Sequence, residues 1–104
     1  MPATTPNPPY YSLAFTTIVS PGTFEVFTKL IEFVKESAPK ARGFLGLEEA
    51  MGQKEWITIL YWADREAIDE WSKGLRLFAA KHPTLMMAFL SSKARIAKVE
   101  KALP

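Results

Sequence analysis

The chain has 104 residues, with 13 Lys and Arg against 11 Asp and Glu, and a formal net charge of +2. This charge is too small to favour nucleic acid as a partner. The absence of cysteine excludes disulfides, thiolate metal sites and thiol nucleophiles, and a single histidine, His82, excludes a metal centre built from several histidines of one chain.

The first nine residues form an arm that carries four prolines, and we expect this arm to be flexible. It lacks the basic and apolar regions of a signal peptide, and no apolar run in the chain approaches the ~20 residues of a membrane-spanning helix. We therefore expect one folded domain over residues 10–104, in a cytoplasmic protein that has no membrane partner.

Residues 10–19 predict a strand, because β-branched and aromatic residues dominate the segment. Leu13 and Phe15 would then point to the same face of a sheet. Residues 20–37 predict an amphipathic helix, in which apolar residues from Phe24 to Val34 recur at steps of three and four. Pro39 would end this helix.

Residues 43–51 and 55–63 predict two strands joined by a short turn at Gly52. The second of these strands is apolar in both directions, with Trp62 on one face and Tyr61 on the other. Strands of this kind are covered on both sides. Since a small domain has helices for only one side of its sheet, the other side is expected to pack against the sheet of a second copy.

Residues 64–82 predict a second helix, capped by Asp64 and broken or kinked at Gly74. Pro83 would stop it, and a further short helix is expected over residues 84–90. Periodicity does not decide whether residues 91–101 form a strand or a helix, because their composition favours helix while their alternation allows a strand.

Three segments in this order resemble the antibiotic biosynthesis monooxygenase (ABM) domain superfamily: "GFLGLE", "ITILYWADREAIDEW" and "ARIAKVE". The resemblance covers residues 10–101. It implies an α+β, ferredoxin-like single domain with a four-stranded antiparallel sheet and helices on one face. Two such domains would pair through their sheet faces into a homodimeric α+β barrel, and the last segment would be the fourth strand.

The haem-degrading branch of this superfamily uses an asparagine on the first strand, a tryptophan in the second helix and a histidine after it. By resemblance, Trp71 matches the tryptophan and Phe15 stands at or near the asparagine position. Lys81 takes the histidine position, with His82 one residue later, which on a helix is a rotation of about 100°. Two of the three residues are therefore absent or displaced.

A commoner bacterial branch carries a histidine some six residues after the helix tryptophan and aromatic residues near the final strand. By resemblance, Leu77 takes the place of that histidine. Phe89 keeps the aromatic character, whereas Ser92 replaces a bulky ring. The chain thus matches the family in its scaffold and departs from it at the polar positions.

A cofactor-independent oxygenase needs a base near neutral pH and a dry apolar pocket. His82 is the candidate catalytic base, because the ordinary pKa of histidine is about 6.5; the alternative is an exposed histidine at a helix end. We expect the substrate pocket to be lined by four aromatic residues, for which ordinary core packing is the alternative interpretation. These residues are Phe15, Trp62, Trp71 and Phe89.

The first functional hypothesis is a cofactor-independent ABM-type monooxygenase that acts on an aromatic or quinone-like small molecule. The second is a non-catalytic dimeric ligand-binding or stress-related protein of the same fold. The third is a haem-binding or haem-degrading protein. The first two need no metal and no cofactor, and their partners are a second copy of the chain and a small apolar or aromatic ligand.

Overall fold

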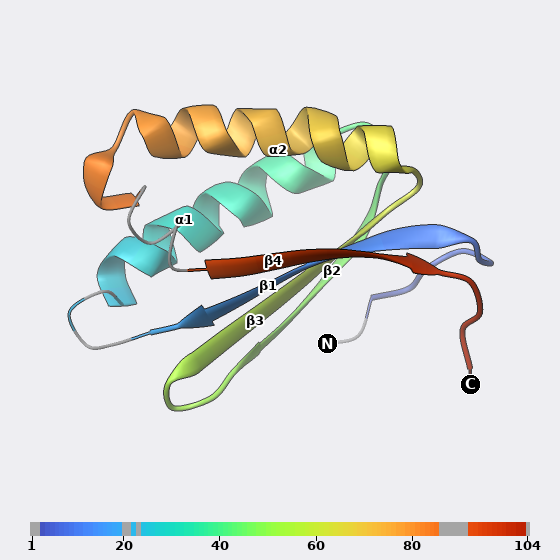
Figure 1. The fold of residues 1–104 in the computed structure, drawn as a ribbon, viewed down its shortest axis with the longest axis horizontal. Helices are drawn as coiled ribbons and strands as arrows, with labels where there is room; N and C mark the ends of the chain where they lie inside the picture. Colours follow the sequence, from blue (N-terminus) through green and yellow to red (C-terminus); the bar gives the residue numbers. More distant parts are fainter. Residues whose placement is uncertain (1–2, 20–21, 23, 86–91, 104) are drawn as a thin grey trace.

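The computed structural model describes residues 3–19, 22, 24–85 and 92–103. Its four strands form an antiparallel sheet in the order β2-β3-β1-β4, and two long helices cover one face of that sheet (Figure 1). The elements are β1 (Tyr10–Ile18), α1 (Phe24–Ser37), the 3-10 turn η1 (Ala38–Lys40), β2 (Phe44–Met51), β3 (Glu55–Trp62), α2 (Arg65–Ala80) and β4 (Ser92–Val99). This is the predicted ferredoxin-like α+β domain.

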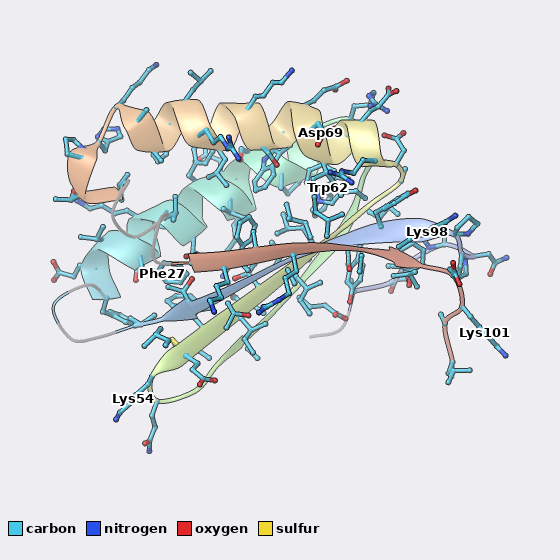
Figure 2. All side chains as sticks on the ribbon, in the orientation of Figure 1. Phe27, Lys54, Trp62, Asp69, Lys98 and Lys101 are labelled. Atoms are coloured by element: carbon cyan, nitrogen blue, oxygen red, sulfur yellow. The ribbon has the colours of Figure 1, made fainter. Side chains whose placement is uncertain are left out.

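The alternation of side chains along the central strands separates the two faces of the sheet. On β3, buried residues from Trp56 to Trp62 alternate with half-buried ones. Leu13 pairs with Leu60 and therefore shares its helix-facing side. Figure 2 shows Phe27 and Trp62 in the layer between sheet and helices. The strand that the sequence predicts to be apolar on both faces thus has one face against the helices and the other on the open side.

The C-terminal segment is a strand, as the family resemblance implies. β4 pairs antiparallel with β1 along its whole length, and Ile96 lies opposite Leu13. Helix propensity is outweighed here because the free edge of β1 offers a complete ladder of backbone hydrogen bonds.

Helix α2 runs without a break from Arg65 to Ala80, so the predicted break or kink at Gly74 is wrong. Trp71 and Leu75, on either side of the glycine, are 6% and 2% exposed. Their burial holds the helix on the sheet and outweighs the cost of one glycine, which is about 1 kcal/mol. The predicted short helix after Pro83 lies mostly outside the described residues.

The two glycines of the segment "GFLGLE", Gly43 and Gly46, make different contacts. Gly43 has φ +82°, and a Cβ there would lie 2.7 Å from the Cβ of Ala67, so the position requires glycine for two reasons. Gly46 lies on β2 with Ala3 of the N-terminal arm directly above it.

Candidate functional site

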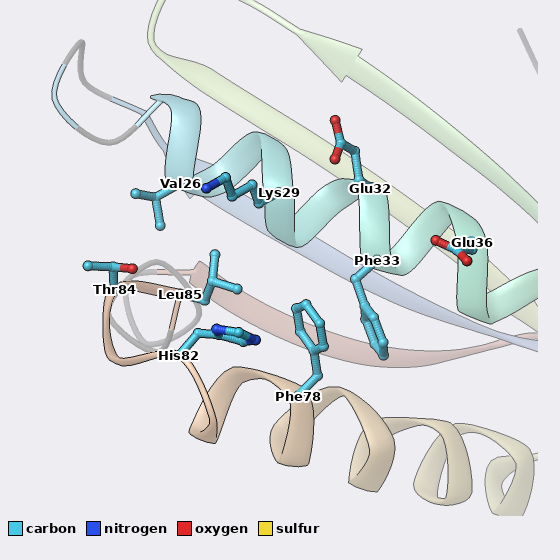
Figure 3. A pocket seen from close by; sticks show the side chains of 9 residues that line it. All are labelled: Val26, Lys29, Glu32, Phe33, Glu36, Phe78, His82, Thr84 and Leu85. Carbon is cyan, nitrogen blue, oxygen red and sulfur yellow. The ribbon is translucent and has the colours of Figure 1, made fainter.

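A cavity of about 460 Å³ lies between α1 and the C-terminal end of α2 (Figure 3). This volume is within the range of small-molecule pockets. Its walls combine apolar and aromatic side chains with charged ones at the rim. They are Val26, Lys29, Glu32, Phe33, Glu36, Phe78, His82, Thr84 and Leu85.

Three rings form a continuous row along this cavity. Phe33 of α1 and Phe78 of α2 are stacked, with centroids 4.0 Å apart and planes at 13°. The His82 ring follows at 5.2 Å from Phe78, tilted by 52°. Figure 3 shows Phe33 and Phe78 projecting from the two helices, and His82 from the segment just after α2, into the space between the helices. The two stacked rings cover each other's inner faces, so a planar ligand here would meet their edges or outer faces together with the imidazole.

Among the described residues, a backbone hydrogen bond, and no hydrogen bond of its side chain, fixes the position of His82. Its amide donates to the carbonyl of Ala79 over 3.1 Å, which fixes the residue just beyond the end of α2. The residue is exposed, and no side chain of the described residues forms a hydrogen bond with its ring. Both ring nitrogens are therefore available to a ligand or to water.

Phe15 lines a second cavity, between α2 and the sheet, of about 250 Å³. Leu13, Ile68 and Leu75 contribute apolar surface to it, and Arg65 and Arg76 contribute charge. A third space, beneath α1 and also bordered by Phe15, holds only about 10 Å³, which is about the space of one water. The structure therefore places Phe15 and His82 at different cavities.

The two tryptophans predicted for the pocket are packed together in the core. Trp62 is 0% exposed and Trp71 6%, with ring centroids 5.4 Å apart. Trp71 Nε1 donates to Ser37 Oγ over 3.1 Å, whereas Trp62 Nε1 is buried without a partner among the described residues. Neither tryptophan lines either of the two larger cavities. Phe89, the fourth predicted residue, lies outside the described residues.

Sequence reasoning missed Phe33, which stacks on Phe78. The available signal was its place in the helix: Phe33 stands next to Glu32 and outside the buried stripe of α1, which is Phe27, Leu30, Ile31 and Val34. A large aromatic residue there indicates a contact with another element, here α2.

A polar cluster on the open face of the sheet was also missed. Tyr61 donates a hydrogen bond to Glu48 over 2.5 Å, and this bond, together with one from the Ala3 amide, lowers the pKa of Glu48. Burial and the same carboxylate raise the pKa of Tyr61 to about 12. Periodicity places both residues on strands but does not show that the strands bring them together.

The described residues contain no group of three His, Asp or Glu side chains placed to hold a metal ion. They also do not fit the haem arrangement. By the resemblance, that arrangement combines a histidine with the positions of Trp71 and Phe15, whereas His82 lies at the α1–α2 cavity and Phe15 at the other. Within the part of the chain that the structure describes, no helix is long and apolar enough to cross a membrane.

No family model matches the chain. It is 32% identical over 103 residues to the uncharacterized protein YqjZ of Bacillus subtilis (strain 168), a match that covers 93% of this chain and 85% of YqjZ. A relative at this identity, aligned over nearly the whole of both chains, shows common family membership.

Several solved structures share the fold at lower identity. PA3566 from Pseudomonas aeruginosa aligns with TM-score 0.67 and 13% identity, over 94% of this chain and 99% of that one. A dimeric ferredoxin-like protein of unknown function from Jannaschia sp. CCS1 aligns with TM-score 0.57 and 14% identity, over 89% and 99%.

SnoaB, a cofactor-independent oxygenase from Streptomyces nogalater, aligns with TM-score 0.52 and 15% identity, over 92% of this chain and 95% of that one. Identities this low establish the fold alone. The chain therefore belongs to the family of the Bacillus subtilis protein YqjZ and has the ferredoxin-like fold of these solved structures.

Proposed function

We propose that the chain is a cofactor-independent monooxygenase that binds an aromatic or quinone-like molecule in the α1–α2 cavity. The observation that carries the proposal is the placement of the His82 ring on the wall of a 460 Å³ cavity, 5.2 Å from Phe78. The fold shared with the oxygenase SnoaB is consistent with this activity. We further propose that the protein is a cytoplasmic homodimer paired through the open sheet faces.

In this proposal, His82 acts as the general base. Its neutral imidazole takes a proton from an activated CH₂ group of the substrate, such as that of an anthrone or of the keto tautomer of a quinol, and the resulting carbanion reduces O₂. One oxygen atom remains as the carbonyl of the product, and the other leaves as water with the two hydrogens of the CH₂ group. The substrate supplies all the electrons, so the protein contributes a base, a binding slot and charge.

The other cavity residues have matching roles in the proposal. The stacked Phe33–Phe78 pair offers its ring edges and outer faces to a planar ring. The cavity wall carries one lysine, Lys29, and two carboxylates, Glu32 and Glu36. In the proposal, Lys29 is the group that stabilises negative charge developing on a substrate oxygen.

The experiment that tests this function measures oxygen uptake with a panel of quinols and anthrones. His82→Ala should lower kcat by a factor of about 10² to 10⁴, the usual contribution of a general base. Lys81→Ala is the matched control, because Lys81 is the exposed neighbour and does not line the cavity. Equal uptake by the wild type and His82→Ala would remove His82 as the base.

The position of the substrate is tested by a second pair of variants. Phe78→Leu should raise KM if the ligand lies in the α1–α2 cavity, whereas Phe15→Leu should raise it if the ligand lies between α2 and the sheet. A rise with Phe15→Leu alone would move the substrate away from His82.

A non-catalytic ligand-binding protein is the second candidate. The observation that favours it is the exposed His82 ring, which no described side chain orients by a hydrogen bond. Catalytic histidines are usually oriented by a third group. Saturable quinol binding without oxygen uptake would support this candidate over the first.

A further inference from the structure

The N-terminal arm lies on the face of the sheet opposite the helices (Figure 1). The Ala3 amide donates to Glu48 Oε2 over 2.9 Å, and Thr5 Oγ1 donates to the hydroxyl of Tyr10 over 3.1 Å. The Cβ of Ala3 lies 2.7 Å from where a Cβ at Gly46 would stand. The arm therefore approaches the sheet as closely as the absence of a side chain at position 46 allows.

Four residues of the sheet form the surface on which the arm lies. We call this surface the arm patch, and its residues are Gly46, Glu48, Tyr10 and Tyr61. Tyr61 bonds to Glu48 over 2.5 Å and packs edge-on against Tyr10, with ring centroids 5.7 Å apart. Tyr10 is only 5% exposed, although it faces away from the helices. Contacts with both Glu48 and Tyr10 therefore fix the arm at two points.

The arm patch is part of the face that, in our proposal, packs on a second copy. Sheets that pack face to face stand about 10 Å apart, and side chains from both sheets fill the gap. An extended chain lying on one sheet takes up the space that the side chains of the partner sheet need. The arm and a partner sheet therefore exclude each other over this patch.

The charges of the open face favour a second copy as the alternative occupant. β2 and β4 are the two edges of the sheet. Glu48 lies on the open side of β2, while Lys93 and Arg95 lie on the open side of β4, opposite Thr16 and Ala14 of β1. A two-fold axis along the strands would set the acidic edge of one copy against the basic edge of the other.

We propose that the N-terminal arm competes with a second copy of the chain for the arm patch, so that release of the arm strengthens dimerisation. This inference rests on the proposed homodimer. It assigns the arm the role of a built-in competitor, and it gives Gly46 the role of admitting the arm.

The test compares full-length variants by sedimentation equilibrium. Gly46→Ala adds a methyl group where Ala3 stands, and Ala3→Asp places a carboxylate beside Glu48 while leaving the sheet unchanged. Each should lower the dimer Kd by about tenfold, the equivalent of one or two lost arm contacts. Gly52→Ala is the matched control, since its Cβ would have no neighbour closer than 3.9 Å, and its Kd should equal that of the wild type.

A dimer Kd that is unchanged in both test variants would overturn the competition, and a raised Kd would show that the arm belongs to the interface instead. Ala3→Asp keeps the test valid if Gly46→Ala disturbs the strand. Absence of any dimer at 100 µM, about a hundredfold above a micromolar Kd, would overturn the homodimer and the competition together. Oxygen uptake by such a monomer would leave the proposed activity standing.

Discussion

The indole Nε1 of Trp71 donates a hydrogen bond to the hydroxyl of Ser37 across 3.1 Å. This bond joins the middle of α2 to the last residue of α1, 34 positions earlier in the chain. The α1–α2 cavity lies between the same two helices. The Trp71–Ser37 contact therefore helps to set the helix spacing on which the Phe33–Phe78 stack depends.

Replacing Ser37 with Ala should lower the free energy of unfolding by about 1–2 kcal/mol, because a buried indole N–H is left without an acceptor. Urea denaturation measures the change. The control is a double-mutant cycle: in a Trp71→Phe background, Ser37→Ala should have little effect. An equal loss in both backgrounds would show that the hydrogen bond is not its cause.

Gly74→Ala should raise the free energy of unfolding by about 0.5–1 kcal/mol. The helix continues through this position, and a Cβ there would meet no atom within 4 Å, so the substitution restricts the unfolded chain without a clash. Thermal and urea unfolding both report the gain. A loss of stability would mean that α2 is distorted at Gly74.

The raised pKa of Tyr61, about 12, predicts a late step in the ultraviolet titration of the tyrosines. Burial and the Glu48 carboxylate both favour the protonated phenol, so this group stabilises the fold below its ordinary pKa of 10.0. That contribution is lost as the pH rises through 12. Tyr61→Phe should remove the late step, and Glu48→Gln should move it to lower pH. If the step near pH 12 in the ultraviolet titration were unchanged in Tyr61→Phe, that step would not belong to Tyr61.

Asp64 makes the stability of the protein depend on pH in the acid range. Hydrogen bonds from Arg42 and from the Ala67 amide, at the start of α2, lower the pKa of Asp64 below its usual 3.8. The stabilisation is therefore complete above pH 3.8 and is lost as the pH falls through the lower pKa of the folded state. In Asp64→Asn, the free energy of unfolding should fall less steeply as the pH is lowered through the acid range. An equally steep fall in Asp64→Asn and in the wild type would show that Asp64 does not contribute to this pH dependence.

The fold was predictable because its main signals are local. The spacing of apolar residues in α1 indicates a helix, and Asp64 marks the start of the second helix. The apolar residues on both faces of β3 indicate a strand. The resemblance to a known family then decided the strand at β4, for which periodicity was ambiguous. Within the part of the chain that the structure describes, the continuity of α2 at Gly74 was mispredicted, because local propensity does not include the burial of Trp71 and Leu75.

The candidate site was less predictable because it depends on contacts between distant segments. The family resemblance suggested that Phe15, Trp71 and His82 would belong to one pocket. Tertiary packing instead buries Trp71 against Trp62 and leaves His82 with Phe33 and Phe78. The direction of a side chain beyond the end of a helix depends on its neighbours in space, which periodicity does not contain.

In the proposed function, a planar ligand binds beside His82. Because the chain has one histidine, selective ¹⁵N labelling of histidine gives the ring signals of His82 alone. Titration with a naphthoquinol under argon should shift these signals saturably in the wild type, and much less in Phe78→Leu. Ring signals that stay constant while tryptophan fluorescence reports saturable binding would place the ligand elsewhere and contradict the account.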